Sequence, residues 1–380
     1  KPLQVPPHSS EFSFWKPGKG YTPNYSFPIQ KNGFRPLALI DRSLKSSFFS
    51  GESFQRELFL VNDSPSDQSG TIEVKIIALD GKLIAKKAVK AAAKRGYAVS
   101  KKISMKLPAS FEGHCRYEAS FKSNDGKTAD IWSREIRISK KAGAEFGKTF
   151  KSKVAVFGNG SLKEELSSLG LKFEYLKSLE SAKLAAFQLL IVEKDAVKIG
   201  STMNRQMREF ARSGGRVLLL EQNVSPFSGL PLECKALQTQ FIRAPQHPAL
   251  QGMSDSDFAF WGNAPYPAQA GDCYITERVY VKNDSKHALF LLDGDEGGFG
   301  TGGLAYSGLL EVKEGAGCIL ACQLQVTDNL KKSASAELLL LKMFQALDSF
   351  APASKTPFEV SDGSNPAEIA AKAKAGKTII

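Results

Sequence analysis

The fold of the second half of the chain is decided by the stretch Lys153-Val154-Ala155-Val156-Phe157-Gly158-Asn159-Gly160-Ser161. Its first five residues include four apolar ones, which predicts a buried strand, and the glycines that follow predict a tight turn. Leu162, Leu166 and Leu169 then recur at helical spacing before Gly170 ends the helix. A strand, a turn and a helix in this order begin an α/β unit.

Beyond this unit the alternation of strands and helices continues. Further strands are predicted at 173–176, 189–192, 217–220, 288–292 and 317–323, and helices at about 203–211 and 334–346. Continuous apolar runs after short helices predict a parallel sheet that is covered on both faces, with right-handed crossovers. Residues 150–350 are therefore interpreted as a Rossmann- or flavodoxin-like, three-layer α/β domain.

Residues 34–140 follow a different pattern, in which short β-type runs alternate with turn residues. The seven predicted strands are 36–40, 53–61, 70–79, 83–89, 98–107, 114–122 and 130–138. The pair Asp80-Gly81 predicts a two-residue hairpin turn in which both residues take positive φ. Seven short strands in about 100 residues are typical of an immunoglobulin-like β-sandwich, so the whole chain is predicted to be a multidomain β plus α/β protein.

Both ends of the chain have the composition of linkers. Residues 1–33 are rich in Pro, Gly, Ser and aromatic side chains without regular periodicity, and residues 351–380 are rich in Lys, Ala, Pro and Ser. We interpret the first segment as an extended arm over a neighbouring domain and the second as a linker or tail. Since the sequence opens on Lys1 without a signal-peptide pattern, it is expected to be part of a longer polypeptide.

Composition excludes several classes of protein. Hydrophobic residues make up 42% and charged residues 24%, which suits a globular protein with real cores. The net charge is +12, but the basic residues are spread along the chain, and the densest stretch, 82–106, alternates lysines with apolar residues as solvent-facing strands do. We therefore expect no specific nucleic-acid site. No run of about 18 apolar residues predicts a membrane span, and five dispersed cysteines favour buried thiols over disulfides or zinc.

No cofactor or metal is predicted. The turn at 158–161 lies where dinucleotide-binding folds hold phosphate, but Lys163 stands at the third glycine position and no acidic residue ends a clear second strand. A tight turn without a nucleotide is the favoured interpretation. The run Asp293-Gly294-Asp295-Glu296 alternates carboxylates like a calcium loop, yet the closing glutamate is missing, so a glycine-rich loop is favoured over a metal site.

Five residues are candidates for binding. Glu221 follows the strand at 217–220, at the sheet edge where α/β folds place ligands, but it lacks the small neighbours of a nucleophile elbow, so a hydrogen-bonding role is favoured over catalysis. His247, in the loop at 243–253, and Trp261 are candidate pocket residues, with a packed loop as the alternative. Trp15 and Trp132 are candidates for stacking on sugars, with burial against their own protein as the alternative.

Short motifs carry a family resemblance over most of residues 34–348. In the first domain Phe34-Arg35-Pro36-Leu37-Ala38-Leu39-Ile40-Asp41-Arg42, Phe48-Phe49-Ser50-Gly51-Glu52 and Leu60-Val61-Asn62-Asp63-Ser64 resemble the start of the sandwich that follows the barrel of glycoside hydrolase family 2-like proteins. In the second, His247-Pro248-Ala249-Leu250-Gln251-Gly252, Gly308-Leu309-Leu310-Glu311-Val312 and residues 315–323 resemble glutamine-amidotransferase-like or β-galactosidase trimerisation-type domains.

The resemblance implies a non-catalytic accessory region of a glycoside hydrolase that packs on the catalytic barrel of its own polypeptide, or forms a homo-oligomer, and supports the substrate cleft. It also favours an extracellular or periplasmic location. The barrel, its two glutamates and the Gly-x-Cys-x-Gly elbow are absent from this sequence, so no catalytic residue is carried over. A carbohydrate-binding module and a degenerate amidotransferase- or esterase-like hydrolase stay open as alternatives.

Overall fold

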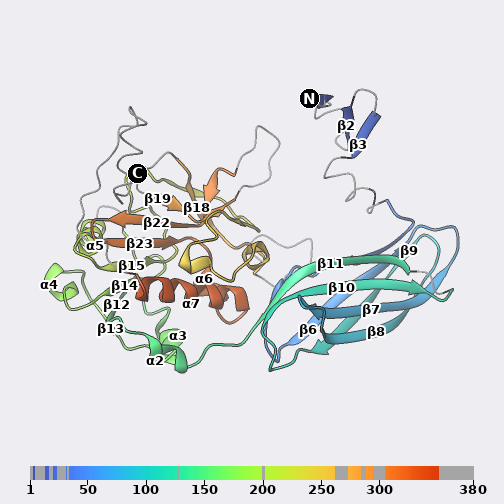
Figure 1. Ribbon diagram of the computed structural model, residues 1–380, viewed down its shortest axis with the longest axis horizontal. Coiled ribbons are helices and arrows are strands. Elements are labelled where there is room, and N and C mark those ends of the chain that lie inside the picture. The colour runs from blue at the N-terminus through green and yellow to red at the C-terminus, as the bar shows by residue number, and fades with distance from the viewer. Residues whose placement is uncertain are drawn as a thin grey trace, which may run out of the picture.

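The computed structural model describes residue 31, residues 34–125, 128–198, 202–261, 273–283, 288–294 and 304–350, and three short strands before them. These strands are β1 (Leu3–Gln4), β2 (Ser13–Lys16) and β3 (Gly20–Pro23), which form a small antiparallel sheet that the arm's lack of periodicity did not predict. The rest of the arm and the predicted tail at 351–380 lie outside the described residues. The fold is rich in β-sheet and has two lobes side by side (Figure 1).

The first lobe is a sandwich of two sheets. One sheet has the order β4-β6-β9 and the other the order β5-β11-β10-β7-β8. All neighbouring pairs are antiparallel except β11 and β5, which are parallel. The strands are β4 (Leu37–Asp41), β5 (Ser47–Phe49), β6 (Ser53–Asn62), β7 (Gln68–Ala78), β8 (Leu83–Ala93), β9 (Tyr97–Lys106), β10 (Gly113–Ser123) and β11 (Thr128–Ser139).

Alternating side chains form the core of the sandwich. On β6, every second residue from Phe54 to Asn62 is buried, among them Leu58 and Leu60, while the residues between them are partly or fully exposed. All seven predicted strands are present, and β5 was missed because three residues are too few to show a period. The hairpin prediction was half right, since Gly81 has a φ of +89° but Asp80 does not have a positive φ. The register of β7 and β8 shifts between Ile76 and Ile77, close to this turn.

The second lobe is built on a seven-stranded sheet with the order β13-β12-β14-β15-β23-β22-β19. The first five strands are parallel, whereas β22 and β19 run antiparallel to their neighbours. The prediction of a wholly parallel sheet was therefore wrong at one edge, because β22 and β23 form a tight hairpin. The strands are β12 (Val154–Phe157), β13 (Phe173–Tyr175), β14 (Leu189–Val192), β15 (Arg216–Leu219), β19 (Ala288–Phe290), β22 (Leu309–Glu314) and β23 (Gly317–Cys322).

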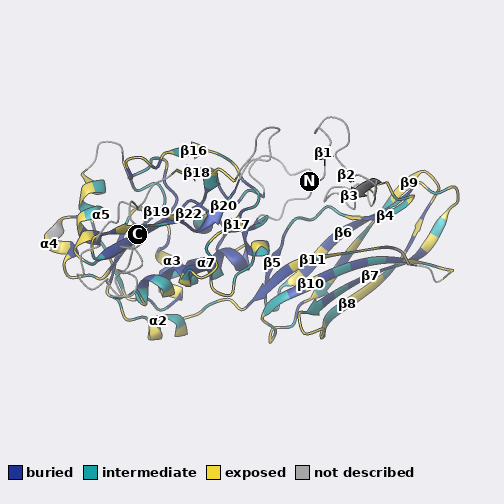
Figure 2. Ribbon diagram, turned by 45° about the horizontal axis from the view of Figure 1, so that its top comes forward, coloured by how far each residue is buried: buried dark blue, intermediate teal, exposed yellow. Residues whose placement is uncertain are grey.

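Helices cover both faces of this sheet. One face of its central strands packs against α3 (Lys163–Ser168) and α7 (Ala334–Asp348), and the other packs against α5 (Met203–Arg212). Successive strand residues enter opposite cores, so Ala155 faces α5 and Val156 faces α7. Figure 2 shows the resulting band of buried residues along the sheet and α7.

Shorter elements complete the second lobe. They are α2 (Glu145–Thr149), α4 (Ser181–Leu184), α6 (Val326–Asn329), the 3-10 helices η1 (Pro248–Leu250) and η2 (Asp255–Phe258), and the strands β16 (Leu232–Cys234), β17 (Phe241–Ile242), β18 (Arg278–Val281), β20 (Leu292–Asp293) and β21 (Tyr306–Ser307). Four of the five cysteines are buried, as expected, and Cys234 is exposed. Within the described ranges, every helix is too short or too polar to cross a bilayer.

Candidate functional site

The turn after β12 is filled by a carboxylate of the chain itself. Glu193 follows β14, the strand next to β12, and its side chain is fully buried. Its Oε2 accepts a hydrogen bond from the backbone N–H of Gly160 at 2.6 Å, and its Oε1 accepts from the N–H of Leu162 at 2.9 Å and from the hydroxyl of Tyr175 at 2.7 Å. Burial and the bond to Glu193 raise the pKa of Tyr175.

The carboxylate of Glu193 occupies the turn that precedes α3. Backbone N–H groups at the start of a helix attract anions, and here two of them already bind Glu193. The fit is close, because a Cβ at Gly158 would lie 2.4 Å from Oε2 of Glu193. Because Gly158 has no Cβ, the carboxylate of Glu193 fits into the turn. The N–H groups of Gly160 and Leu162 thereby have an acceptor within the chain.

Glu221 lies at the end of β15 and is also turned inward. Its Oε1 accepts from the backbone N–H of Thr327 at 3.2 Å, and its Oε2 accepts from the Thr327 hydroxyl at 3.3 Å. It therefore caps the start of α6, as the sequence suggested. The adjoining pocket, which Lys194 and Arg278 also line, has a volume of about 20 Å³, which is room for about one water molecule.

Burial raises the pKa of Glu221 from 4.5 to about 7, against the charge of Lys194 and the backbone hydrogen bonds, which act to lower it. An acid whose pKa is higher in the folded state favours folding when protonated, so the stabilising contribution of Glu221 is complete below about pH 4.5 and is lost as the pH rises from 4.5 through 7. At pH 8 the ionised carboxylate destabilises the fold by about 3 kcal/mol.

Glu221→Gln is therefore expected to change stability in a pH-dependent way. Relative to the parent chain, the variant should gain about 1–3 kcal/mol in free energy of unfolding at pH 8 and little or nothing at pH 5. Urea unfolding at the two pH values measures this difference. Glu174→Gln, which changes an exposed carboxylate on β13, is the matched control and should show no such dependence. An equal effect of Glu221→Gln at both pH values would contradict the pKa of about 7.

The other two candidate pocket residues lie in different surroundings. His247 caps η1, where its Nδ1 accepts from the N–H of Ala249 at 3.2 Å and its Nε2 donates to Glu311 at 3.2 Å. Trp261 is 1% exposed and its Nε1 donates to the carbonyl of Asp257 at 2.6 Å. Among the described residues no hydrogen bond joins any two of Glu221, His247 and Trp261.

Of the two candidate stacking residues, the structure describes the side chain of Trp132 and only the strand pairing of Trp15. Trp132 on β11 is half-buried, with its Nε1 donating to the carbonyl of Leu39 at 3.0 Å and its ring edge-on to Tyr117 at 5.1 Å. The guanidinium of Arg134 lies 5.5 Å from its ring centre. Trp15 pairs with Tyr21 and Leu3 in the small N-terminal sheet, and its side chain is outside the described part of the chain.

A buried ionic network joins the two lobes. Asp257, on η2 of the second lobe, is fully buried, and both of its oxygens accept hydrogen bonds from the guanidinium of Arg137 on β11 of the sandwich. His114 on β10 lies 3.0 Å from Oδ2 of Asp257, and the hydroxyl of Ser335 on α7 donates to Oδ1 at 2.6 Å. A bidentate, charge-assisted pair of this kind fixes orientation as well as distance.

The network holds Asp257 in its ionised form. Although burial alone would raise its pKa, the hydrogen bonds from His114, Arg137 and Ser335 together with the Arg137 charge lower it to about 2. Two further contacts cross between the lobes nearby, from the Ser46 hydroxyl to the carbonyl of Ala259 at 2.6 Å and between the hydroxyls of Ser47 and Ser333 at 2.9 Å. The lobes are therefore held together by buried polar contacts from β5, β10 and β11.

Sequence reasoning missed both Glu193 and Asp257. A signal for Asp257 was present, since Ser254 and Asp257 have the spacing of a capping box and form one around η2. The signal for Glu193 was its position directly after the apolar strand predicted at 189–192. The acidic loop that begins at Asp293 lies mostly outside the described residues, and within them no cluster of His, Cys, Asp and Glu side chains is arranged to hold a metal.

Comparisons with known proteins give partial structural matches alone. No family model matches the chain, and no curated protein matches it. Among solved structures, the sporulation control protein Spo0M from Bacillus subtilis is 12% identical over 27% of this chain, with a TM-score of 0.22. A β-glucosidase from Listeria innocua is 17% identical over 28% of this chain, also with a TM-score of 0.22.

A third match is the alkylpurine DNA glycosylase AlkC from Pseudomonas fluorescens, which is 14% identical over 29% of this chain with a TM-score of 0.22. The matched parts span 49% of the Spo0M chain, 16% of the β-glucosidase and 35% of AlkC. At this TM-score none of these likenesses defines the fold or the activity of the chain.

Proposed function

We propose that this chain is a non-catalytic accessory region of a carbohydrate-processing enzyme, in which it packs against the catalytic barrel and supports the substrate cleft or a homo-oligomeric assembly. The observation that carries the non-catalytic part is the state of the sheet's carboxyl edge. There Glu193 is bound by the turn at 158–162, and Glu221 caps α6 beside a pocket with room for about one water molecule.

The junction of the lobes supports a scaffolding role. Catalytic and ligand-binding proteins often place their sites between lobes that move, whereas the Arg137–Asp257 pair and the Ser47–Ser333 contact bury polar groups that motion would expose. Lobes held in this way suit a region whose task is to present a surface of fixed shape to a neighbour.

The carbohydrate context and the finer fold class come from the sequence motifs. We propose that the second lobe is a Rossmann-like domain of the glutamine-amidotransferase-like type, as the motifs around His247 and Gly308 suggest. Those motifs occupy packed positions here, because His247 caps η1 against α7 and residues 308–312 enter β22. The packing of these residues supports the view that the shared motifs maintain the fold and do not take part in catalysis.

Turnover by the chain on its own tests the non-catalytic role. We expect the purified chain to hydrolyse no aryl glycoside or ester, while the longer polypeptide that contains it hydrolyses a glycoside. Glu221→Gln should leave any trace activity of the purified chain unchanged, because a contaminating enzyme would be its source. Enzyme-like turnover that survives repurification and is lost in Glu221→Gln would overturn the proposal. The coding sequence on either side of this segment should encode a barrel with two catalytic glutamates.

A further inference from the structure

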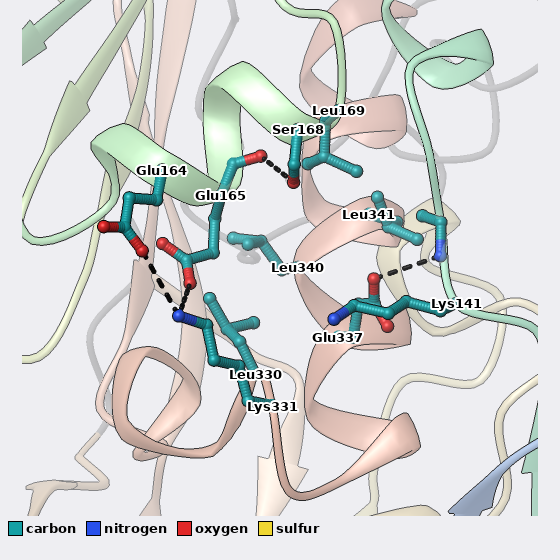
Figure 3. Close-up of a pocket in the computed structure, with 11 residues that line it drawn as sticks. Lys141, Glu164, Glu165, Ser168, Leu169, Leu330, Lys331, Glu337, Leu340 and Leu341 are labelled. Carbon is teal, nitrogen blue, oxygen red and sulfur yellow. Dashed lines mark hydrogen bonds and ion pairs between the residues drawn. The ribbon is translucent and has the colours of Figure 1, made fainter. Parts of the chain in front are cut away.

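A pocket of about 220 Å³ lies between α3, α7 and residues 141–142, the segment that follows the sandwich (Figure 3). Its apolar floor consists of four leucines, Leu169, Leu330, Leu340 and Leu341. None of the residues discussed above as candidates for binding lines it. The pocket is therefore distinct from the sites of those candidates.

One carboxylate in the pocket is only half satisfied. Glu337, in the first turn of α7, is 8% exposed, and its Oε1 accepts from the backbone N–H of Ala142 at 3.1 Å. Its Oε2 is buried and has no hydrogen-bond partner in the described part of the chain. Desolvation by burial raises the pKa of Glu337, against the charge of Lys141. Buried polar atoms in native proteins are nearly always paired, so this acceptor is an exception that a bound donor would resolve.

The charges around the pocket favour a cation. Lys331 lies 3.3 Å from Glu164 and 3.5 Å from Glu165, so its charge is already engaged at the rim, as Figure 3 shows. Lys141 is the other cation in the lining, and its charge acts on Glu337 without a hydrogen bond to Oε2. Counted as ionised, the three carboxylates of the lining outnumber its two ammonium groups by one. A purely apolar ligand would leave Oε2 of Glu337 unpaired.

We propose that this pocket binds an alkylammonium group, with its methylene chain against the leucines and its N–H donors directed to Oε2 of Glu337. This chemistry has two sources, the lysine side chain of another protein or domain and a free aliphatic amine. A lysine side chain buries its methylene stem along apolar surface while its ammonium group seeks a polar partner, which matches the two parts of this pocket. The ligand class follows from the pocket itself and stands independently of the accessory role proposed above.

Two probes test the site and separate its sources. The chain, labelled at its leucine methyl groups, is titrated by NMR with n-pentylammonium and, separately, with Nα-acetyl-lysine N-methylamide. We expect saturable shifts of the Leu340 and Leu341 methyl signals with n-pentylammonium. Tighter binding of the lysine derivative identifies a protein side chain as the source, and binding of n-pentylammonium alone identifies a small amine. No saturable shift with either probe would overturn the proposal.

Variants test the role of Glu337. Glu337→Gln keeps an acceptor for the N–H of Ala142 and should weaken binding of the probes by about tenfold or more, because a charge-assisted hydrogen bond is lost. The matched control Glu164→Gln removes a carboxylate at the exposed rim and should weaken binding by less than about threefold. Ser168→Phe, at the exposed rim, should block the pocket. Unchanged affinity in Glu337→Gln, or equal affinity for uncharged n-pentanol, would refute the site.

Discussion

Asp257→Asn is expected to lower the free energy of unfolding by about 3–5 kcal/mol. The substitution leaves the Arg137 guanidinium, which is 6% exposed, without its charged partner, and the new amide N–H₂ faces a donor instead of accepting from it. Breaking one side of a buried ion pair is among the most damaging single changes a protein can undergo. Urea unfolding followed by circular dichroism measures the loss.

Asp255→Asn is the matched control, since Asp255 is exposed in the same short helix and its amide oxygen can still accept from the N–H of Ile242. It should change the free energy of unfolding by less than about 0.5 kcal/mol. Trypsin should also cut after the exposed Lys140 and Lys141 faster in Asp257→Asn than in the parent, because the lobes separate more readily. Parent-like stability of Asp257→Asn would show that the network contributes nothing.

The same carboxylate sets a dependence on acid. Since the folded-state pKa of about 2 lies below the usual 3.8, Asp257 stabilises the fold by about 2 kcal/mol above pH 4, and this contribution is lost as the pH falls from 4 through 2. The parent chain should therefore lose stability over that range more steeply than Asp257→Asn does.

Glu193→Ala is expected to cost about 3 kcal/mol, because it leaves the buried N–H of Leu162 and the partly buried N–H of Gly160 and hydroxyl of Tyr175 without their acceptor. It should also create an anion site where the carboxylate stood. Acetate, which supplies the missing group, should therefore raise the melting temperature of Glu193→Ala and leave that of the parent unchanged at equal ionic strength.

Glu174→Ala removes an exposed carboxylate from the neighbouring strand β13 and serves as the control, with little change in stability and no response to acetate. A Glu193→Ala variant as stable as the parent would mean that water satisfies the turn equally well. Restoration by sodium chloride to the same extent as by acetate would argue for general screening and against a specific anion site.

Much of the fold could be predicted because its signals are local. The runs at 189–192 and 217–220 are apolar enough to predict buried strands, and the alternation along β6 predicts one buried face. The strand β22 was not among the predicted strands, and an apolar run would not have given its direction. That direction depends instead on the hairpin that joins β22 to β23.

The candidate site was harder to predict, because its contacts join distant residues. Arg137 and Asp257 are separated by 120 positions, and each has an ordinary local sequence. Glu221 was found because it ends a strand, and its interpretation as a hydrogen-bonding residue agrees with its contact to Thr327. Its pKa depends on burial, which the sequence around it does not reveal.

The junction between the lobes has a mechanical consequence. Separate domains in one chain usually turn relative to each other, because few contacts cross between them. Here a buried ion pair connects β11 to η2, and two hydroxyl contacts connect Ser46 and Ser47, at the start of β5, to Ala259 after η2 and to Ser333, the residue before α7. These contacts tie the orientation of the sandwich to that of the second lobe, so the two lobes are expected to turn as one body.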